Sequence, residues 1–497
     1  MLPPSFGRDL SASVVVFLVA LPLCVGVAVA SGVPAETGLI TGIVGGIVVG
    51  MLPGSSMQVS GPAAGLTVLV AEAVREFGLG ALGVIVLAAG LIQLLLGFLG
   101  LGRWFRAVSV SVVEGMLAGV GLVIIAGQLY AMADQSSPSS GLGKITGLPG
   151  LVSDVAGSPH ALSALGVGAG TVLVMLLWQR MPQRVRLVPG ALIAVVLSAS
   201  VTWLFDLPLK KVEVRGLLES VDLPGGGDFG ALAQVGVLGT VVAFTLIASA
   251  ESLFSAAAVD RLHNGPRTDF NKELMAQGAG NTVCGLLGAL PMTAVIVRSA
   301  TNVNAGARTK VSRVLHGVWL LLFAVLFPAV LGIIPLAAFA GVLVHAGWKL
   351  LPTDRIVPMW REHRMEAVIM VVTALAIVTV NMFEGVLIGL GLSILKLAWE
   401  TSHVRVRTTD TGSGTIRVAL SGNATFLRLP VILDSLEALP ADRPVELDLS
   451  GLRHRDLAST TALNTWAERH NDVGSRVRIT EKAEAEEETK EPVGASL

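Results

Sequence analysis

The sequence predicts an all-α polytopic membrane protein with about fourteen transmembrane segments in two corresponding halves of seven, followed by a small α/β domain. Hydrophobic residues make up 53% of the 497 residues and charged residues only 14%, whereas soluble proteins carry about 25% charged residues. The charges cluster between long apolar runs, and two of these runs are interrupted at corresponding places in the two halves.

The apolar runs have the length of membrane-spanning helices, since about 20 residues cross the hydrocarbon core. The 57 glycines fit such helices, because small residues let helix backbones approach closely. The N-terminal run resembles a signal peptide but is long enough to span, so we interpret it as the first helix. The predicted spans lie near 11–30, 35–52, 57–75, 79–101, 107–133, 163–179, 187–205, 232–258, 271–289, 293–305, 313–334, 336–350, 365–381 and 383–400.

The loops between these spans differ in their positive charge. If the N-terminus is cytoplasmic, alternate loops should be rich in Lys and Arg. The predicted outside loop 134–160 has Lys144 as its one basic residue apart from histidine, and the 206–231 loop is mixed. We therefore expect an even number of spans in the inner (plasma) membrane, with both termini cytoplasmic. The predicted inside loops carry Arg103, Arg106, Arg180, Arg184, Arg186, Arg261, Arg267, Lys272, Arg308, Lys310, Arg313, Lys349, Arg355, Arg361 and Arg364.

Glycine and proline interrupt the third apolar segment of each half. Ser60–Gly65 breaks the first of these segments and Leu290–Thr293 breaks the second. Paired interruptions of this kind indicate an inverted-repeat transporter and point to its binding site. The alternative is two ordinary kinks in unrelated helices.

The composition changes to a soluble pattern after about residue 400. The sequence predicts a membrane domain over 1–400, an α/β domain over 401–480 and a disordered, charge-rich tail over 481–497. Within the second domain, alternating residues predict strands and amphipathic spacing predicts helices. The predicted strands are Thr415–Leu420, Val445–Leu449 and Arg476–Thr480, and the predicted helices are Leu429–Leu439 and Leu457–Asn471.

Several classes of function find no support in the sequence. The net charge of −1 suggests no nucleic-acid partner. Cys24 and Cys284 form neither a disulfide framework nor a metal-ligand spacing. Neither a nucleophile motif of the form Gly-x-Ser-x-Gly nor a P-loop is present. We therefore expect no enzymatic activity, no cofactor and no ATP-driven pumping.

Two stretches of the chain closely resemble the SulP family of anion transporters. Residues 58–65, Gln-Val-Ser-Gly-Pro-Ala-Ala-Gly, match the third span of that family, and Gly278–Thr309 resembles its ninth and tenth spans. Val445–Asp456 is similar to part of its STAS domain. The run Leu-Pro-Met-Thr-Ala-Val-Ile-Val-Arg-Ser-Ala-Thr-Asn is most similar to a bacterial branch that is often associated with carbonic anhydrase, which hints at bicarbonate.

The resemblance implies fourteen segments in two inverted repeats of seven, with a core domain and a gate domain that move in elevator-like alternating access. It also implies a homodimer, and an anion seated between the N-termini of the third and tenth spans. In soluble relatives of the STAS domain a phosphorylated Ser follows the Asp, but here Leu457 follows Asp456. A role in assembly, trafficking or regulation by contact is therefore expected for this domain in place of a phosphorylation switch.

Helix N-termini can stabilise an anion in the membrane through free N–H groups and a partial positive charge of about half an elementary charge. Arg298 is the one Lys or Arg near the middle of a predicted span, and an intramembrane charge is a functional hypothesis by default. The alternative is that Arg298 snorkels to the cytoplasmic surface. The family often has Ser where this chain has Val295 and Val297. The predicted substrate-binding residues are Ser60, Gly61, Pro62, Ala63, Ala64, Thr293, Ala294, Val295, Ile296 and Arg298.

Glu251 lies in the middle of the eighth predicted span, where a carboxylate is costly unless it meets a proton, a cation or Arg298. Ser255 is four residues later, on the same helix face. Glu251 and Ser255 are therefore predicted to couple transport to Na⁺ or H⁺, with Na⁺ at these oxygens as the only metal expected. The alternative is a structural pair between Glu251 and Arg298.

The predicted function is a secondary active transporter of small inorganic anions, with bicarbonate and sulfate as the leading substrates. An anion channel or exchanger keeps the same architecture with a different mode of transport. A nucleobase carrier of the related fold would hydrogen-bond its ligand to Glu251, but the STAS-like domain favours an anion. Asn281 and Asn302, which flank the tenth span, are predicted to satisfy interrupted backbone.

Overall fold

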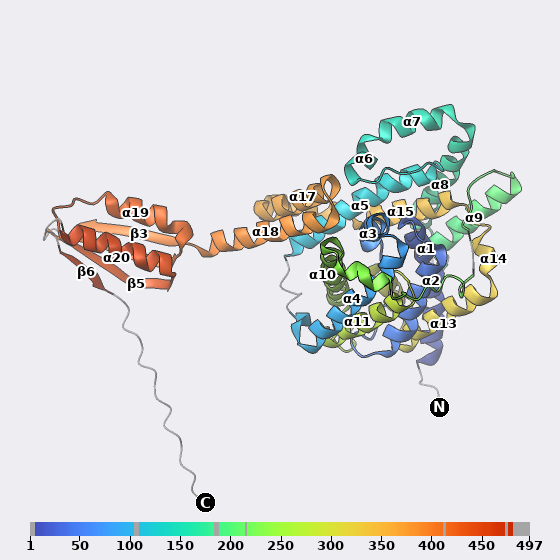
Figure 1. The fold of residues 1–497 in the computed structure, drawn as a ribbon, viewed down its shortest axis with the longest axis horizontal. Helices are drawn as coiled ribbons and strands as arrows, with labels where there is room; N and C mark the ends of the chain where they lie inside the picture. The colour runs from blue at the N-terminus through green and yellow to red at the C-terminus, as the bar shows by residue number, and fades with distance from the viewer. Residues whose placement is uncertain are drawn as a thin grey trace, which may run out of the picture. The chain divides into compact units, whose positions relative to one another are not determined.

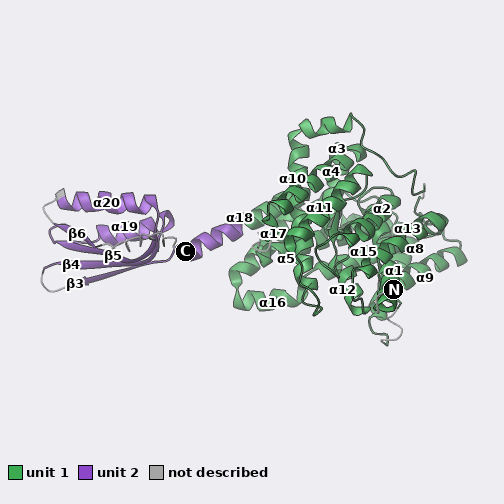
Figure 2. Cartoon of the chain, turned by 90° about the horizontal axis from the view of Figure 1, so that it is seen from below, with its two compact units in different colours: residues 1–390 green, residues 391–497 purple. Residues whose placement is uncertain are grey.

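The computed structural model describes residues 5–103, 109–182, 188–213, 216–410, 414–472 and 476–480. Arg106, Arg184, Arg186 and the predicted disordered tail lie outside the described residues. The chain forms two compact units, residues 1–390 and 391–497 (Figure 2). The division falls inside one helix, α18 (Met382–Thr401), slightly before the predicted boundary at 400.

The first half of unit 1 is a succession of helices with one short strand (Figure 1). A π-helical turn, Gly45–Val49, extends α2, and a 3₁₀ turn, Ala64–Leu66, separates β1 from α3. The elements are α1 (Phe6–Ala30), α2 (Ala35–Val44), β1 (Ser60–Pro62), α3 (Thr67–Phe77), α4 (Leu79–Phe98), α5 (Val110–Met132), α6 (Gly141–Thr146), α7 (Leu148–Gly157), α8 (Pro159–Trp178) and α9 (Gly190–Leu204).

The second half repeats this order, including the short strand before a short helix. A bridge between Lys211 and Pro335 connects the segment between the halves to the start of α15. The elements are α10 (Val235–Val259), α11 (Phe270–Leu286), β2 (Met292–Ala294), α12 (Ile296–Asn304), α13 (Val311–Leu326), α14 (Pro328–Leu331), α15 (Leu336–Leu350), α16 (Thr353–Glu362), α17 (Arg364–Thr379) and α18.

A helix lies in each predicted span, but the spans differ in length and polarity. Among the described residues, seven helices are long and apolar enough to cross a membrane, so the total of fourteen stays a prediction. The expectation of an all-α membrane domain is wrong in one respect, because β1 and β2 form a two-stranded ribbon. The helices α6, α7 and α16 were not predicted, because they lie in predicted loops and are too short or too polar to be taken for spans.

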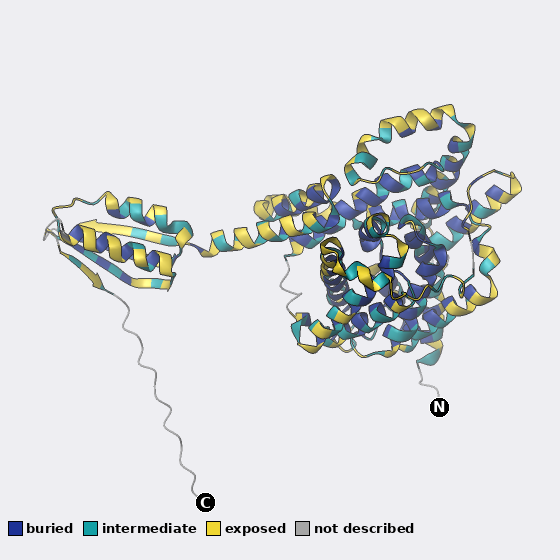
Figure 3. Ribbon diagram, viewed as in Figure 1, coloured by how far each residue is buried: buried dark blue, intermediate teal, exposed yellow. Residues whose placement is uncertain are grey.

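One group of helices packs around α4 and α11, and we call it the α4–α11 group. It contains α1, α2, α3, α10, α12 and α13 together with the ribbon. Glycines let α4 and α11 approach closely: a β-carbon on Gly285 would lie 2.2 Å from Leu87 N, and one on Gly90 would lie 2.4 Å from Thr282 N. Figure 3 shows that the centre of unit 1 is formed mainly by buried residues.

The remaining long helices of unit 1 pack around α5 and α15, and we call them the α5–α15 group. In this group α5 contacts α15 and α17, while α8 packs against α15 and α9. Gly115 of α5 has no room for a side chain, since a β-carbon there would lie 2.5 Å from Met370 O. The two groups meet where α1 contacts α15 and α9.

Unit 2 contains a four-stranded sheet in the order β3-β4-β5-β6, with β3 antiparallel to β4 and the other pairs parallel. Asp448 on β5 accepts hydrogen bonds from the Ser450 hydroxyl and from Arg417 on β4, and these bonds lower the pKa of Asp448. The predicted strands and helices are present, but β3 was not predicted. The elements are β3 (Val404–Asp410), β4 (Ile416–Ala424), α19 (Leu429–Glu437), β5 (Val445–Arg455), α20 (Leu457–Asp472) and β6 (Val477–Thr480).

Candidate functional site

The two interrupted segments meet inside unit 1. Ser60–Pro62 pairs antiparallel with Met292–Ala294, so that Pro62 lies opposite Met292. Val295 N continues the ribbon by donating to Val59 O at 3.0 Å. An interruption leaves backbone groups that a continuous helix would have paired, and unpaired groups inside a membrane are costly. Each interrupted segment therefore supplies the partners that the other one lacks.

Buried side chains satisfy further backbone groups around this ribbon. Asn281 accepts a hydrogen bond from Met292 N at 2.7 Å and donates to Met292 O at 3.2 Å. Asn302 donates to Met57 O at 3.0 Å. The predicted role of both asparagines is confirmed. Serine hydroxyls contribute as well, with Val59 N donating to Ser299 at 2.9 Å and Ala294 N donating to Ser252 at 3.2 Å.

A pocket of about 470 Å³ lies between the two helix groups. The α4–α11 group lines it with residues of α1, α10, α12, β1 and the 3₁₀ turn before α3, and the α5–α15 group lines it with residues of α5, α8, α9 and α15. The chain just before α3 and the first turn of α12 both reach this pocket. The N-terminus of α12 and the turn that leads into α3 therefore lie at one cavity, and helix N-termini carry free N–H groups and partial positive charge.

The pocket contains part of the predicted substrate-binding set. Pro62, Ala64, Val295, Ile296 and Arg298 line it, as do Glu251 and Ser255. The other predicted residues, which are not among the lining residues, are Ser60, Gly61, Ala63, Thr293 and Ala294. All but Ala63 lie in the ribbon; the Ser60 hydroxyl accepts a hydrogen bond from Gln277 at 2.7 Å.

Arg298 lies on α12 with its side chain buried beneath the pocket. It is 1% exposed, which excludes the alternative that it snorkels to the surface. Its Nη2 donates to Pro62 O at 3.2 Å, while Nε and Nη1 are buried without a hydrogen-bond partner. In the part of the chain that the structure describes, no carboxylate lies within ion-pair distance of it. The guanidinium charge is therefore not compensated by the described protein groups.

Glu251 on α10 lies next to Gly65 of the first interrupted segment. A β-carbon on Gly65 would lie 2.9 Å from Glu251 Oε2, so a side chain at this position would push the carboxylate away. Oε2 is buried without a hydrogen-bond partner. The described residues contain no ion pair between Glu251 and Arg298, and the structural-pair alternative therefore loses its support.

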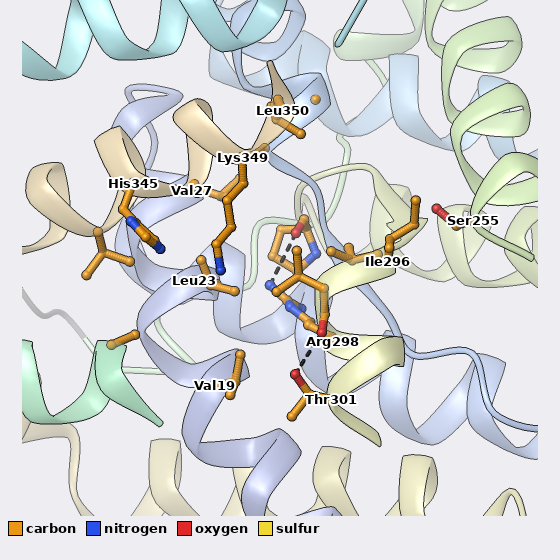
Figure 4. Close-up of a pocket in the computed structure, with 18 of the residues that line it drawn as sticks. Val19, Leu23, Val27, Ser255, Ile296, Arg298, Thr301, His345, Lys349 and Leu350 are labelled. Atoms are coloured by element: carbon orange, nitrogen blue, oxygen red, sulfur yellow. Dashed lines mark hydrogen bonds between the residues drawn. The ribbon is translucent and has the colours of Figure 1, made fainter. Parts of the chain in front are cut away.

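The α5–α15 group contributes polar residues that were not predicted as site residues. Gln179, which directly follows α8, and His345 and Lys349 of α15 line the pocket, and Gln179 Nε2 lies 3.2 Å from His345 Nε2. Figure 4 shows Lys349 and His345 extending from α15 into the same space as Arg298. Lys349 was assigned to an inside loop together with many other basic residues, so nothing marked it out. The spacing of four residues between His345 and Lys349 places them on one helix face and is the only signal that could have found them.

The pocket has the chemistry of a site for a small anion. Its walls are mainly aliphatic, with Val19, Leu23 and Val27 of α1 among them, and its basic groups converge from two sides. The described residues contain no cluster of three or more His, Cys, Asp or Glu side chains that could hold a metal ion. The arrangement can desolvate an anion partly, hold it by charge and backbone N–H groups, and sense a cation or proton at Glu251.

Comparison with known sequences gives this arrangement a family context. The profile of the Sulfate permease family matches residues 6–373. "Putative sulfate transporter YvdB" of Bacillus subtilis is 29% identical over 396 residues, covering 78% of this chain and 73% of that protein. Bicarbonate transporter BicA of Synechocystis is 26% identical over 506 residues, covering 95% of this chain and 87% of that protein.

Solved structures share the fold. The transmembrane domain of a cyanobacterium bicarbonate transporter, BicA, matches with a TM-score of 0.67 at 24% identity, covering 79% of this chain and 98% of that chain. Murine Slc26a9 in the inward-facing state matches with a TM-score of 0.78 at 16% identity, covering 96% of this chain and 86% of that chain. The likeness at these identities concerns the fold alone, which is that of a helical membrane transporter.

Proposed function

The chain belongs to the sulfate permease family, and on this premise we propose that it is a secondary active transporter of small inorganic anions that binds its substrate beside Arg298. The family consists of membrane transporters and not of enzymes. The protein is accordingly a multi-pass membrane protein whose relatives are named for sulfate and bicarbonate transport.

The uncompensated charge of Arg298 is the observation that carries this proposal. A buried, unpaired guanidinium is costly in a low-dielectric interior. An anion in the pocket would offset that cost, and the two helix N-termini would add to the attraction. The buried arginine therefore favours a bound anion more strongly than it favours a neutral ligand such as a nucleobase.

Among inorganic anions we rank bicarbonate before sulfate. The Born cost of removing an ion from water rises with the square of its charge. The aliphatic walls of this pocket, and the valines at positions 295 and 297, give a divalent anion few groups to replace its water. BicA, named as a bicarbonate transporter, also aligns over 95% of the chain.

Alternating access follows from the position of the pocket between two helix groups. The lining residues Gln179, Lys349, Thr301 and Val113 all lie at the helix ends that the loop charges place on the cytoplasmic side. We propose that this arrangement is open to the inside, and that the α4–α11 group carries the anion past the α5–α15 group in an elevator-like motion. Under this proposal the two groups are the core and gate domains expected from the sequence.

Coupling to a cation is proposed at Glu251 and Ser255. The partnerless Glu251 oxygen and the Ser255 hydroxyl lie one turn apart on the pocket side of α10. Oxygen ligands of this kind suit Na⁺, and the carboxylate alone suits H⁺. The contact of Glu251 with Gly65 connects this coupling group to the segment that binds the anion.

The remaining expectations also stand as proposals. We propose a homodimer in the plasma (inner) membrane with both termini cytoplasmic, and a C-terminal unit of the STAS type that acts in assembly, trafficking or regulation by contact. A functional association with carbonic anhydrase would supply or consume bicarbonate at the transporter.

Uptake into proteoliposomes tests the proposed function. Radiolabelled bicarbonate and sulfate are offered separately, while the Na⁺ and pH gradients are varied independently. We expect saturable uptake of bicarbonate, weaker uptake of sulfate and none of uracil or xanthine. Steady anion conductance without saturation would indicate a channel. Absence of flux for bicarbonate, sulfate, chloride and small dicarboxylates would overturn the proposal.

A further inference from the structure

The pocket has a second basic residue on the wall opposite Arg298. Lys349 belongs to the last turn of α15, in the α5–α15 group, whereas Arg298 belongs to α12, in the α4–α11 group. Figure 4 shows the Lys349 side chain directed into the pocket beside Val27 and Leu23, with its amino group on the side of Arg298. Lys349 is exposed, and no acidic partner of it lies within ion-pair distance among the described residues.

We propose that Lys349 is an anion-contacting residue that acts only from the inside, so that the protein binds its substrate more tightly on the cytoplasmic face than on the outer face. This inference rests on the proposed function. Gln179 and His345, which lie near Lys349 on the same wall, supply a polar surface beside it.

The sidedness follows from the helix group to which each residue belongs. Arg298 lies on the same helix group as both interrupted segments and stays with the anion wherever that group moves. Lys349 lies on the other group, and the two groups face each other across the pocket. Relative movement of the groups therefore separates Lys349 from the anion, while Arg298 remains beside it.

A simpler role for Lys349 is that of a solvated charge at the mouth of the pocket. Such a charge would raise the local anion concentration through long-range attraction, which salt screens over about 10 Å at 0.1 M. A direct contact is screened much less. The two roles differ in their salt dependence and in whether a bound anion shields the side chain.

The test compares apparent Km values for bicarbonate on the two faces of the full-length protein, in proteoliposomes sorted by orientation. We expect Lys349→Gln to raise the Km at the cytoplasmic face by on the order of tenfold and to leave the Km at the outer face within about twofold. The rise at the cytoplasmic face should be the same at low and at high salt. Lys349→Arg should restore most of the difference. Lys272→Gln removes another lysine of a predicted inside loop, one that pairs with Asp269, and should change neither Km.

A second measurement does not depend on transport rates. Both native cysteines, Cys24 and Cys284, are buried, so a Lys349→Cys variant offers one accessible thiol. Bicarbonate should slow its modification by a membrane-impermeant thiol reagent applied from the cytoplasmic side. Equal Km changes at both faces, unchanged Km values, or modification that is indifferent to bicarbonate would each overturn the inference while wild-type uptake stands. Loss of wild-type uptake would instead overturn the proposed function.

Discussion

The two interrupted segments of this protein pair in one ribbon but contribute different chemistry. The second segment carries its own charge, Arg298, on the helix that follows the strand. The first segment has no charged residue at the pocket, yet charged groups of other elements contact it at both of its glycines. Arg298 lies against Gly61 and Glu251 lies against Gly65. The first segment thus leaves room for charged groups at Gly61 and Gly65, whereas the second segment supplies a charge of its own.

Reversing the charge of the second segment is the strongest test of whether this segment supplies the charge that binds the anion. Arg298→Glu should lower bicarbonate uptake by about 100-fold or more, because a buried anion would replace a buried cation beside the substrate. Arg298→Lys should keep part of the activity, since it retains a charge but not the planar fork that reaches Pro62 O. Initial uptake rates per folded transporter measure both effects. Substantial uptake by the Glu variant would show that Arg298 does not face the anion.

Adding a side chain to the first segment should have the next largest effect. A β-carbon on Gly61 would lie 2.1 Å from Arg298 Nη1, so Gly61→Ala should displace the guanidinium and weaken uptake by roughly 10- to 100-fold, the range expected for overpacking. Gly170→Ala on α8 is the matched control, because nothing lies within 4 Å of its β-carbon position. If both variants take up bicarbonate at the same rate, the missing side chain at Gly61 is not what makes room for Arg298.

Much of this comparison could be predicted from the sequence, because its signals are local. Prolines and glycines mark both interruptions, and Arg298 stands out as a basic residue inside an apolar run. The register of the ribbon could not be predicted, since each strand has three residues and no alternation to read. Five predicted binding residues lie outside the pocket lining for the same reason: the interruption was visible, but which residues pair and which face the cavity was not.

Other features were missed because their signals are weak or shared. Lys349 looks like any of the cations at the inner ends of the spans, and only the packing of α15 against α5 and α8 brings it to the pocket. The strand β3 alternates valine and arginine before a run of threonines and an aspartate, which is typical of a solvated edge and gives little hydrophobic pattern.

The second glycine of the first segment, Gly65, has Glu251 as its charged neighbour. Glu251→Gln should abolish the stimulation of uptake by a Na⁺ or pH gradient, because the amide carries neither charge nor titratable proton. Anion exchange without a gradient should fall by no more than a few fold. Gly65→Ala should reduce the same stimulation in part, since its β-carbon would lie about 3 Å from the carboxylate. Equal losses of coupled uptake and exchange would place Glu251 at the anion instead.

Ser255 gives the smallest expected effect, and it distinguishes the two coupling ions. A hydroxyl can act as one ligand of Na⁺, whereas proton transfer at Glu251 needs no such ligand. If the coupling ion is Na⁺, Ser255→Ala should raise the Na⁺ concentration for half-maximal uptake by about tenfold, the scale of one lost ligand or hydrogen bond. If the coupling ion is H⁺, the pH dependence of uptake should stay unchanged in this variant. Ser200→Ala on α9, which removes a hydroxyl bonded to Val196 O within its own helix, controls for the loss of a helix hydroxyl away from the pocket. A change in the Km for bicarbonate with no change in cation dependence would show that Ser255 belongs to the anion site and not to the coupling site. In that case α10 would bind the anion together with the two interrupted segments.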